Sequence, residues 1–197
     1  MNQLQLCAQP WWVNLLFLIP VLFYTRVRRL GILISASQLL WMAIFGSAFG
    51  FVEASVVVYL RAAIGLLPGY TGTLQDLRAS SLGYQQSLSI VHFPQSLLTI
   101  EMFREAATMI MLIGVAMLTC TRRTERFAAF LWVFAFWDLT YYLGLWATVR
   151  WPASLLDIDV LFLLPVPWFA QVWFPVLVST LTVIAVLLSQ SRQKTTG

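Results

Sequence analysis

Residues 94–119 read PQSLLTIEMFREAATMIMLIGVAMLT, and this stretch decides the fold class. It is longer than the roughly 20 apolar residues that a helix needs to cross a bilayer. It nevertheless contains three charged residues, Glu101, Arg104 and Glu105. A charge at the centre of a membrane helix costs about 2.5–3.5 kcal/mol on insertion scales, so such residues face a partner, water or a ligand. The stretch therefore predicts a transmembrane helix that carries part of a polar site.

The whole chain has the composition of an integral membrane protein. Its 197 residues are 60% hydrophobic and only 10% charged, with a mean hydropathy of +0.81. A soluble domain carries about 25% charged residues. We therefore expect one all-α integral membrane domain over residues 1–197, with the lipid bilayer as its surroundings and no nucleic acid as a partner.

The apolar runs predict a bundle of about five transmembrane helices. They cover residues 11–25, 31–60, 94–119, 127–149 and 166–189, with outer loops at 62–93 and 150–165. In the second of these loops, residues 160–164 are apolar but too few to span a bilayer, which predicts a re-entrant or interfacial segment before the last helix. Gly46 and Gly50 form a GxxxG pair, which favours close helix packing inside the bundle.

The basic residues predict the orientation of the bundle. Eight of them fall on one side of the predicted spans, namely Arg26, Arg28, Arg29, Arg122, Arg123, Arg126, Arg192 and Lys194, and three on the other, namely Arg61, Arg78 and Arg150. Cytoplasmic loops of membrane proteins carry the excess of Lys and Arg. We expect a bacterial-type cytoplasmic membrane (the cell inner membrane), with the N-terminus outside and the C-terminus in the cytoplasm.

This topology brings four acidic residues to similar depths in the outer half of the membrane. At about 1.5 Å per helical residue, Glu53 lies about 12 Å from the outer end of its helix, Glu101 about 10 Å, Glu105 about 16 Å and Asp138 about 18 Å. The outer loop before the last helix adds two more acids that could fold over the same region. The sequence therefore predicts one carboxylate-rich polar site in the extracytoplasmic half of the bilayer.

Helical spacing groups the candidate residues further. Residues three or four apart share a helix face, so Glu101 lies beside Arg104 and Glu105, while Asp138 lies beside two tyrosines whose hydroxyls can donate hydrogen bonds. The candidates for the polar site are Glu53, Glu101, Arg104, Glu105, Asp138, Tyr141, Tyr142, Asp157 and Asp159. His92, the only histidine, falls at the outer end of the predicted third helix.

Two interpretations of these residues stay open. In a purely structural one, Arg104 pairs with Glu101 or Glu105, and Asp138 contacts Tyr142, only to hold helices together. In a functional one, the excess of acids matters: one arginine among four intramembrane acids leaves a net charge of −3, which calls for protonation, water or a bound cation. A divalent cation is then the candidate cofactor, with Glu101, Glu105 and Asp138 as its candidate ligands.

Three classes of function remain compatible with this pattern. Cation- or proton-linked binding or transport is the preferred hypothesis. Five helices would make a small transporter, so this hypothesis implies a homo-oligomer or a larger membrane complex. A membrane-embedded enzyme acting on a lipid or a membrane-surface substrate is the second, although the chain contains no HExxH, GxSxG or GxGD motif. A non-catalytic subunit or assembly factor of a larger membrane complex is the third. The sequence does not decide whether the chain is an enzyme.

Overall fold

The described part of the chain is a bundle of long helices with one small β-hairpin at one end. The computed structural model describes residue 5 and residues 7–63 and 95–190. Its elements are a 3₁₀-helix η1 (Trp11–Phe17), helices α1 (Leu18–Val27), α2 (Ala36–Ala63), α5 (Gln95–Thr119), α6 (Arg123–Val149) and α7 (Trp173–Gln190), and strands β1 (Ile158–Phe162) and β2 (Trp168–Gln171). Of these, α2, α5, α6 and α7 are long and apolar enough to cross a membrane, which fits the predicted multi-pass helical bundle.

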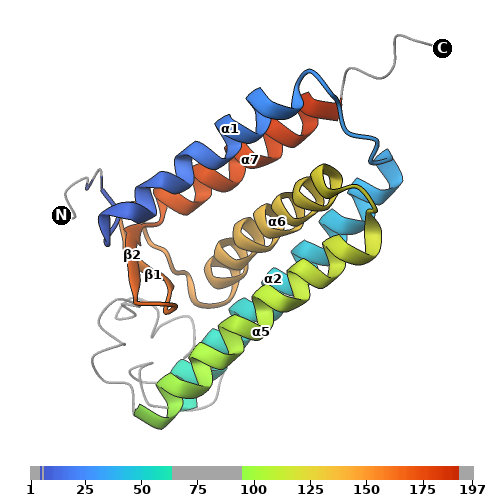
Figure 1. The fold of residues 1–197 in the computed structure, drawn as a ribbon. Helices are drawn as coiled ribbons and strands as arrows, with labels where there is room; N and C mark the ends of the chain where they lie inside the picture. The colour runs from blue at the N-terminus through green and yellow to red at the C-terminus, as the bar shows by residue number, and fades with distance from the viewer. Residues whose placement is uncertain (1–4, 6, 64–94, 191–197) are drawn as a thin grey trace.

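Helix α6 occupies the centre of the bundle. Figure 1 shows it between two helix pairs, with α1 and α7 on one side and α2 and α5 on the other. Its side chains form much of the core, and Val133, Ala135 and Leu145 are fully buried. Helix α5 lies at the outside and exposes large apolar side chains, among them Phe103 and Leu118. Such a surface is typical of a helix that faces lipid.

The contact between α2 and α6 depends on two glycines. A Cβ atom at Gly46 would lie 2.7 Å from the carbonyl oxygen of Val133, and one at Gly50 would overlap the carbonyl oxygen of Trp137. Helix backbones can approach this closely only where the contact residue has no side chain. The predicted use of the GxxxG pair for packing inside the bundle is confirmed.

Three predicted helix starts were wrong, those of α2, α6 and α7. Helix α2 begins at Ala36 and not at residue 31, because Gly31 adopts a left-handed conformation with φ of 68° that ends the preceding turn. Ser35 then forms a capping box: its hydroxyl accepts the N–H of Gln38 at 3.2 Å, and the Gln38 side chain accepts the N–H of Ser35 at 3.0 Å. Helix α6 begins at Arg123, one turn before the predicted 127.

The segment before the last helix is a β-hairpin, so the predicted purely α-helical fold was wrong here. Strands β1 and β2 pair antiparallel, and Gln9 and Phe169 exchange backbone hydrogen bonds that tie the N-terminal segment to the same hairpin. Helix α7 begins at Trp173 and not at residue 166, because residues Trp168–Gln171 pair with β1 as strand β2.

The first predicted outer loop is described only at its start. Helix α2 continues through Ala63, beyond the predicted end at residue 60. The remainder of that loop, residues 64–93, and with it His92, lies outside the described residues.

The glycine contact can be tested by substitution. We expect Gly50→Ala to lower the free energy of unfolding by about 1–3 kcal/mol, because the added methyl group forces α2 away from α6. The matched control is Gly114→Ala in α5, where a Cβ would meet nothing within 4 Å. That change should leave stability unaltered or raise it by up to about 1 kcal/mol through helix propensity. Denaturant unfolding in mild detergent measures both, and equal effects would contradict the packing role.

Candidate functional site

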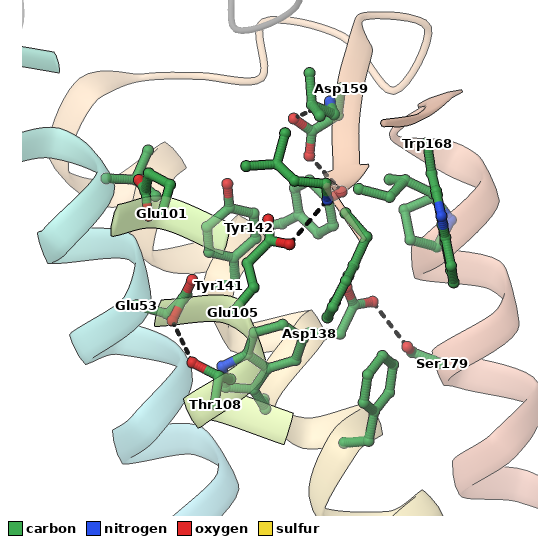
Figure 2. Close-up of a pocket in the computed structure, with 18 of the residues that line it drawn as sticks. Glu53, Glu101, Glu105, Thr108, Asp138, Tyr141, Tyr142, Asp159, Trp168 and Ser179 are labelled. Carbon is green, nitrogen blue, oxygen red and sulfur yellow. Dashed lines mark hydrogen bonds between the residues drawn. The ribbon is translucent and has the colours of Figure 1, made fainter. Parts of the chain in front are cut away.

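One cavity collects nearly all of the predicted polar residues. It lies between α2, α5, α6, α7 and the hairpin and has a volume of about 110 Å³. Its polar lining consists of Glu53, Arg61, Glu101, Arg104, Glu105, Thr108, Asp138, Tyr141, Tyr142, Asp159 and Ser179. Figure 2 shows several of these side chains, with Asp159 entering from the hairpin at the top of the view and Glu105, Asp138 and Ser179 entering from the surrounding helices. Of the predicted candidates, only Asp157 lies elsewhere.

Arg104 joins two helices through its guanidinium group. Its Nη1 forms an ion pair with Glu53 of α2, and its Nε forms a second ion pair with Glu101, one turn earlier on α5. Both carboxylates are buried. The Thr108 hydroxyl also donates to Glu53, at 3.5 Å. The predicted pairing of Arg104 with Glu101 is therefore present, and its second partner is Glu53 and not Glu105.

Glu105 faces the hairpin instead. Its carboxylate accepts the backbone N–H of Leu163 at 2.8 Å, just after the end of β1. The adjacent positions 104 and 105 therefore serve different contacts, because successive side chains on a helix point about 100° apart. Through Glu105, the outer helix α5 is tied to the hairpin.

Two further acids are held by hydroxyl groups. Asp138 accepts a hydrogen bond from Ser179 of α7 at 2.7 Å. Asp159 accepts one from Tyr142 at 2.6 Å and another from the backbone N–H of Val160 at 2.7 Å. The predicted contact between Asp138 and Tyr142 is therefore replaced by two hydrogen bonds. One connects α6 to α7 through Ser179, and the other connects α6 to β1 through Asp159.

Burial raises the pKa of Asp159 to about 7, far above its ordinary value of 3.8. Hydrogen bonds from Tyr142 and Val160 act in the opposite direction, as does the positive charge of Arg61, while the charge of Asp138 raises the pKa further. The carboxyl group at the hairpin end of the cavity thus changes its charge within the physiological pH range.

Asp157 has a local structural role. Its carboxylate accepts the backbone N–H groups of Ala153 at 2.9 Å and Ser154 at 3.2 Å. This pattern stabilises the turn that precedes β1, as Asp does in many turns. Asp157 does not line the cavity.

The predicted candidates omit five residues of the lining that carry a polar side-chain group, namely Arg61, Thr108, Trp137, Trp168 and Ser179. Arg61 was assigned to the outer end of its helix, yet it is buried. One weak signal in the sequence pointed to Ser179. It lies four residues after Pro175 and three before Thr182, so these residues share one face of α7, and two of them carry a hydroxyl group. Trp137 and Trp168 gave none, because tryptophan is common throughout this chain.

The acids do not form a metal cluster. Among the described residues, no group of three or more His, Cys, Asp or Glu side chains is arranged to hold a metal ion. The predicted ligands Glu101, Glu105 and Asp138 instead have three different partners, namely Arg104, the backbone of Leu163 and Ser179. The three predicted ligands are therefore not gathered around one point in the described part of the chain.

Comparison with known proteins gives no match. No protein family, no curated protein and no solved structure is significantly similar to this chain. The function has to be inferred from the chemistry of the cavity.

The Arg104 ion pairs can be tested by a double-mutant cycle. We expect Arg104→Ala to lower the free energy of unfolding by about 3–5 kcal/mol, because it leaves two buried carboxylates without their cation. Adding Glu53→Gln should recover part of that loss, and the coupling appears as non-additivity. Arg122→Ala is the control, since Arg122 is 68% exposed and lies 3.9 Å from Glu125. It should cost no more than about 1 kcal/mol. Simple additivity at Arg104 and Glu53 would contradict the pairing.

The buried Asp159 predicts a pH-dependent stability. The folded protein keeps the proton on Asp159 up to about pH 7, whereas the unfolded chain loses it near 3.8. Its stabilising contribution is therefore complete at acid pH and is lost as pH rises through this window. We expect the thermal midpoint to decrease as the pH rises from about 4 to about 7, and Asp159→Asn to reduce that slope. Tyr142→Phe should extend the slope to higher pH, because it removes a hydrogen bond that lowers the pKa of Asp159. An unchanged slope in both variants would contradict the assignment.

Proposed function

We propose that this chain is a multi-pass membrane protein that binds a cationic ligand in the carboxylate-lined cavity, in competition with protons. The observation that carries the proposal is an imbalance of charge among the described residues. Five acids and two arginines line the cavity, which gives a net charge of −3 when all are ionised. Buried charge of one sign is costly unless a proton or a counter-ion neutralises it.

The hydrogen bonds indicate which acids are available to a ligand. Arg104 forms ion pairs with both Glu53 and Glu101, and its single positive charge leaves these three groups with a net charge of −1 when both acids are ionised. The other three acids, Glu105, Asp138 and Asp159, accept hydrogen bonds from neutral donors, namely a backbone N–H group, a serine and a tyrosine. An ionised carboxylate has about four acceptor positions, so each of these acids retains capacity for a further donor. A cation or a proton supplies the positive charge that these neutral partners lack.

Protons compete for the same groups. Asp159 is the clearest case outside the helices, and it is faced by Tyr142 and Asp138 from α6 and by Arg61 from α2. A proton on Asp159 removes the negative charge that would attract a cation. Ligand affinity should therefore fall as the pH is lowered through about 7.

The membrane topology is also part of the proposal. The 3₁₀-helix η1 rises about 2.0 Å per residue and α1 about 1.5 Å, so together they extend over about 29 Å, close to the thickness of the hydrocarbon core of about 30 Å. We propose that they form the fifth span beside α7. The distribution of basic residues then supports an outside N-terminus, a cytoplasmic C-terminus and a cavity whose hairpin end faces outward.

An enzyme acting on a membrane-surface substrate is the second candidate. The observation in its favour is the 2.6 Å hydrogen bond from the Tyr142 hydroxyl to Asp159 at the hairpin end of the cavity. A tyrosine and a carboxyl group within hydrogen-bond distance can act as an acid and base pair. Cation binding is preferred because it uses the three acids that do not pair with Arg104, namely Glu105, Asp138 and Asp159.

A panel of cations tests the proposed function. The purified protein is heated at about pH 8 in dodecylmaltoside with chloride salts of sodium, potassium, magnesium, calcium and ethylammonium. We expect at least one cation to raise the thermal midpoint in a concentration-dependent manner, because a ligand that binds only the folded state stabilises it. The combined change Glu105→Gln and Asp138→Asn should abolish the effect.

The control is Glu125→Gln. Glu125 is a buried acid of α6 that accepts the N–H of Leu33 at 3.3 Å and does not line the cavity. This variant should respond to the cation as the wild type does. If the double variant and the wild type respond equally, or if Glu125→Gln alone loses the response, the cavity is not the cation site.

A further inference from the structure

The walls of the cavity are aromatic as well as acidic. Seven aromatic side chains line it, namely Phe134, Trp137, Tyr141, Tyr142, Phe162, Trp168 and Phe174. On α6 they form a continuous row: the rings of Phe134 and Trp137 lie 5.3 Å apart, those of Trp137 and Tyr141 6.4 Å, and those of Tyr141 and Tyr142 5.1 Å. Four successive rings on one helix thus form one wall.

The hairpin supplies an aromatic wall of its own. Phe162 of β1 and Trp168 of β2 lie 5.5 Å apart, and Trp12 packs edge-on against Trp168 at 4.9 Å. Figure 2 shows Trp168 and Asp159 both entering from the hairpin. A ligand in the cavity would therefore meet ring surfaces from both α6 and the hairpin, with carboxylates between them.

This combination of groups suits an organic ammonium ion better than a metal ion. Glu105, Asp138 and Asp159 come from α5, α6 and β1 and are not grouped as metal ligands. A hard metal ion needs its oxygen ligands within about 2.0–2.6 Å. An organic ammonium ion is bound by separated carboxylates together with aromatic faces within about 6 Å.

Two indole N–H groups add a requirement for an acceptor. Trp137 is only 7% exposed, and its Nε1 is buried without a hydrogen-bond partner among the described residues. The Nε1 atom of Trp168 is likewise buried without a hydrogen-bond partner among the described residues. Other indoles of this chain do have partners, since Trp132 donates to the carbonyl oxygen of Leu39 at 2.8 Å and Trp173 to Gln171 at 3.0 Å. Buried donors are normally satisfied, so an oxygen atom of a ligand that reached these indoles would supply the missing acceptor.

The volume limits the size of the ligand. An engineered cavity of about 150 Å³ holds benzene, which has six heavy atoms. The present cavity, of about 110 Å³, is somewhat smaller. It has room for a ligand group of about four or five heavy atoms by this comparison.

We propose that the cavity binds a small organic ammonium group that carries a neighbouring hydroxyl or ether oxygen, as in an amino alcohol. The ammonium lies against the carboxylates and the aromatic rings, and the oxygen accepts from the indoles of Trp137 and Trp168. The same chemistry occurs in a free amine and in the head group of an aminophospholipid. This assignment rests on the proposed cation binding and names the class of cation.

Calorimetric titration with ethanolamine and ethylamine tests the assignment, because the two probes differ only in the hydroxyl group. In dodecylmaltoside we expect the wild type to bind ethanolamine at least about tenfold more tightly, since one net hydrogen bond is worth about that factor. Asp138→Asn should remove binding of both amines. Trp137→Phe and Trp168→Phe should each lower ethanolamine affinity toward that of ethylamine and leave ethylamine unchanged, and the two changes together should remove the preference.

Trp132→Phe is the matched control. Trp132 is a buried tryptophan of the same helix that does not line the cavity, so this variant should keep the preference for ethanolamine. Equal affinities of the wild type for the two amines would overturn the acceptor requirement. Stabilisation by an inorganic cation without binding of either amine would overturn the ligand class and leave cation binding intact, whereas no response to any cation would overturn both.

A lipid arm identifies the source of the amine. Ethanolamine is titrated into micelles doped with phosphatidylethanolamine or with phosphatidylglycerol. Competition by phosphatidylethanolamine alone supports the proposal with a lipid head group as the ligand. Equal binding of ethanolamine in both micelles supports it with a free amine.

Discussion

The ion pairs of Arg104 with Glu53 and Glu101 are the constraint on which the rest of this structure depends. Three charged groups within an apolar bundle are tolerated only when they neutralise one another or meet water. Arg104 reaches Glu53 from a helix whose outer face carries exposed apolar side chains, including Phe103. The pair with Glu53 thereby fixes the rotation of α5 about its axis, with Arg104 and Glu105 directed into the bundle.

The position of Glu53 is set in turn by the contact of α2 with α6. Gly46 and Gly50 allow these helices to touch through their backbones, and Glu53 follows Gly50 by one turn at the edge of this contact. Asp138 follows Trp137, whose carbonyl oxygen Gly50 accommodates. Close packing without side chains therefore brings carboxylates of α2 and α6 to the same cavity.

The hairpin completes the cavity and holds the helices around it. Leu163 donates its N–H to Glu105 of α5, and Asp159 accepts from Tyr142 of α6. Each contact is a hydrogen bond between the hairpin and a side chain of the helices. A change of charge on Glu105 or Asp159 would therefore alter the hydrogen bonds that hold the hairpin in place. In the proposed function, binding of a cation in the cavity would therefore alter the stability of the hairpin.

The sequence by itself determined the apolar composition, the long helices that could cross a membrane and the convergence of Glu53, Glu101, Glu105 and Asp138, because hydropathy and helical spacing are local properties. It also indicated the packing role of the glycines. It did not reveal the hairpin, since a short apolar strand and a short helical segment look alike in composition.

Only the tertiary structure decided the partners of each charge. Asp138 binds Ser179, Asp159 binds Tyr142, and Arg61 is buried in the cavity lining. These contacts join residues that are far apart in the chain or lie on different elements, and no spacing rule connects them. The physical reason is that helix rotation and strand pairing are fixed by packing of the whole bundle, and a polar side chain takes whichever partner that packing brings within hydrogen-bond distance.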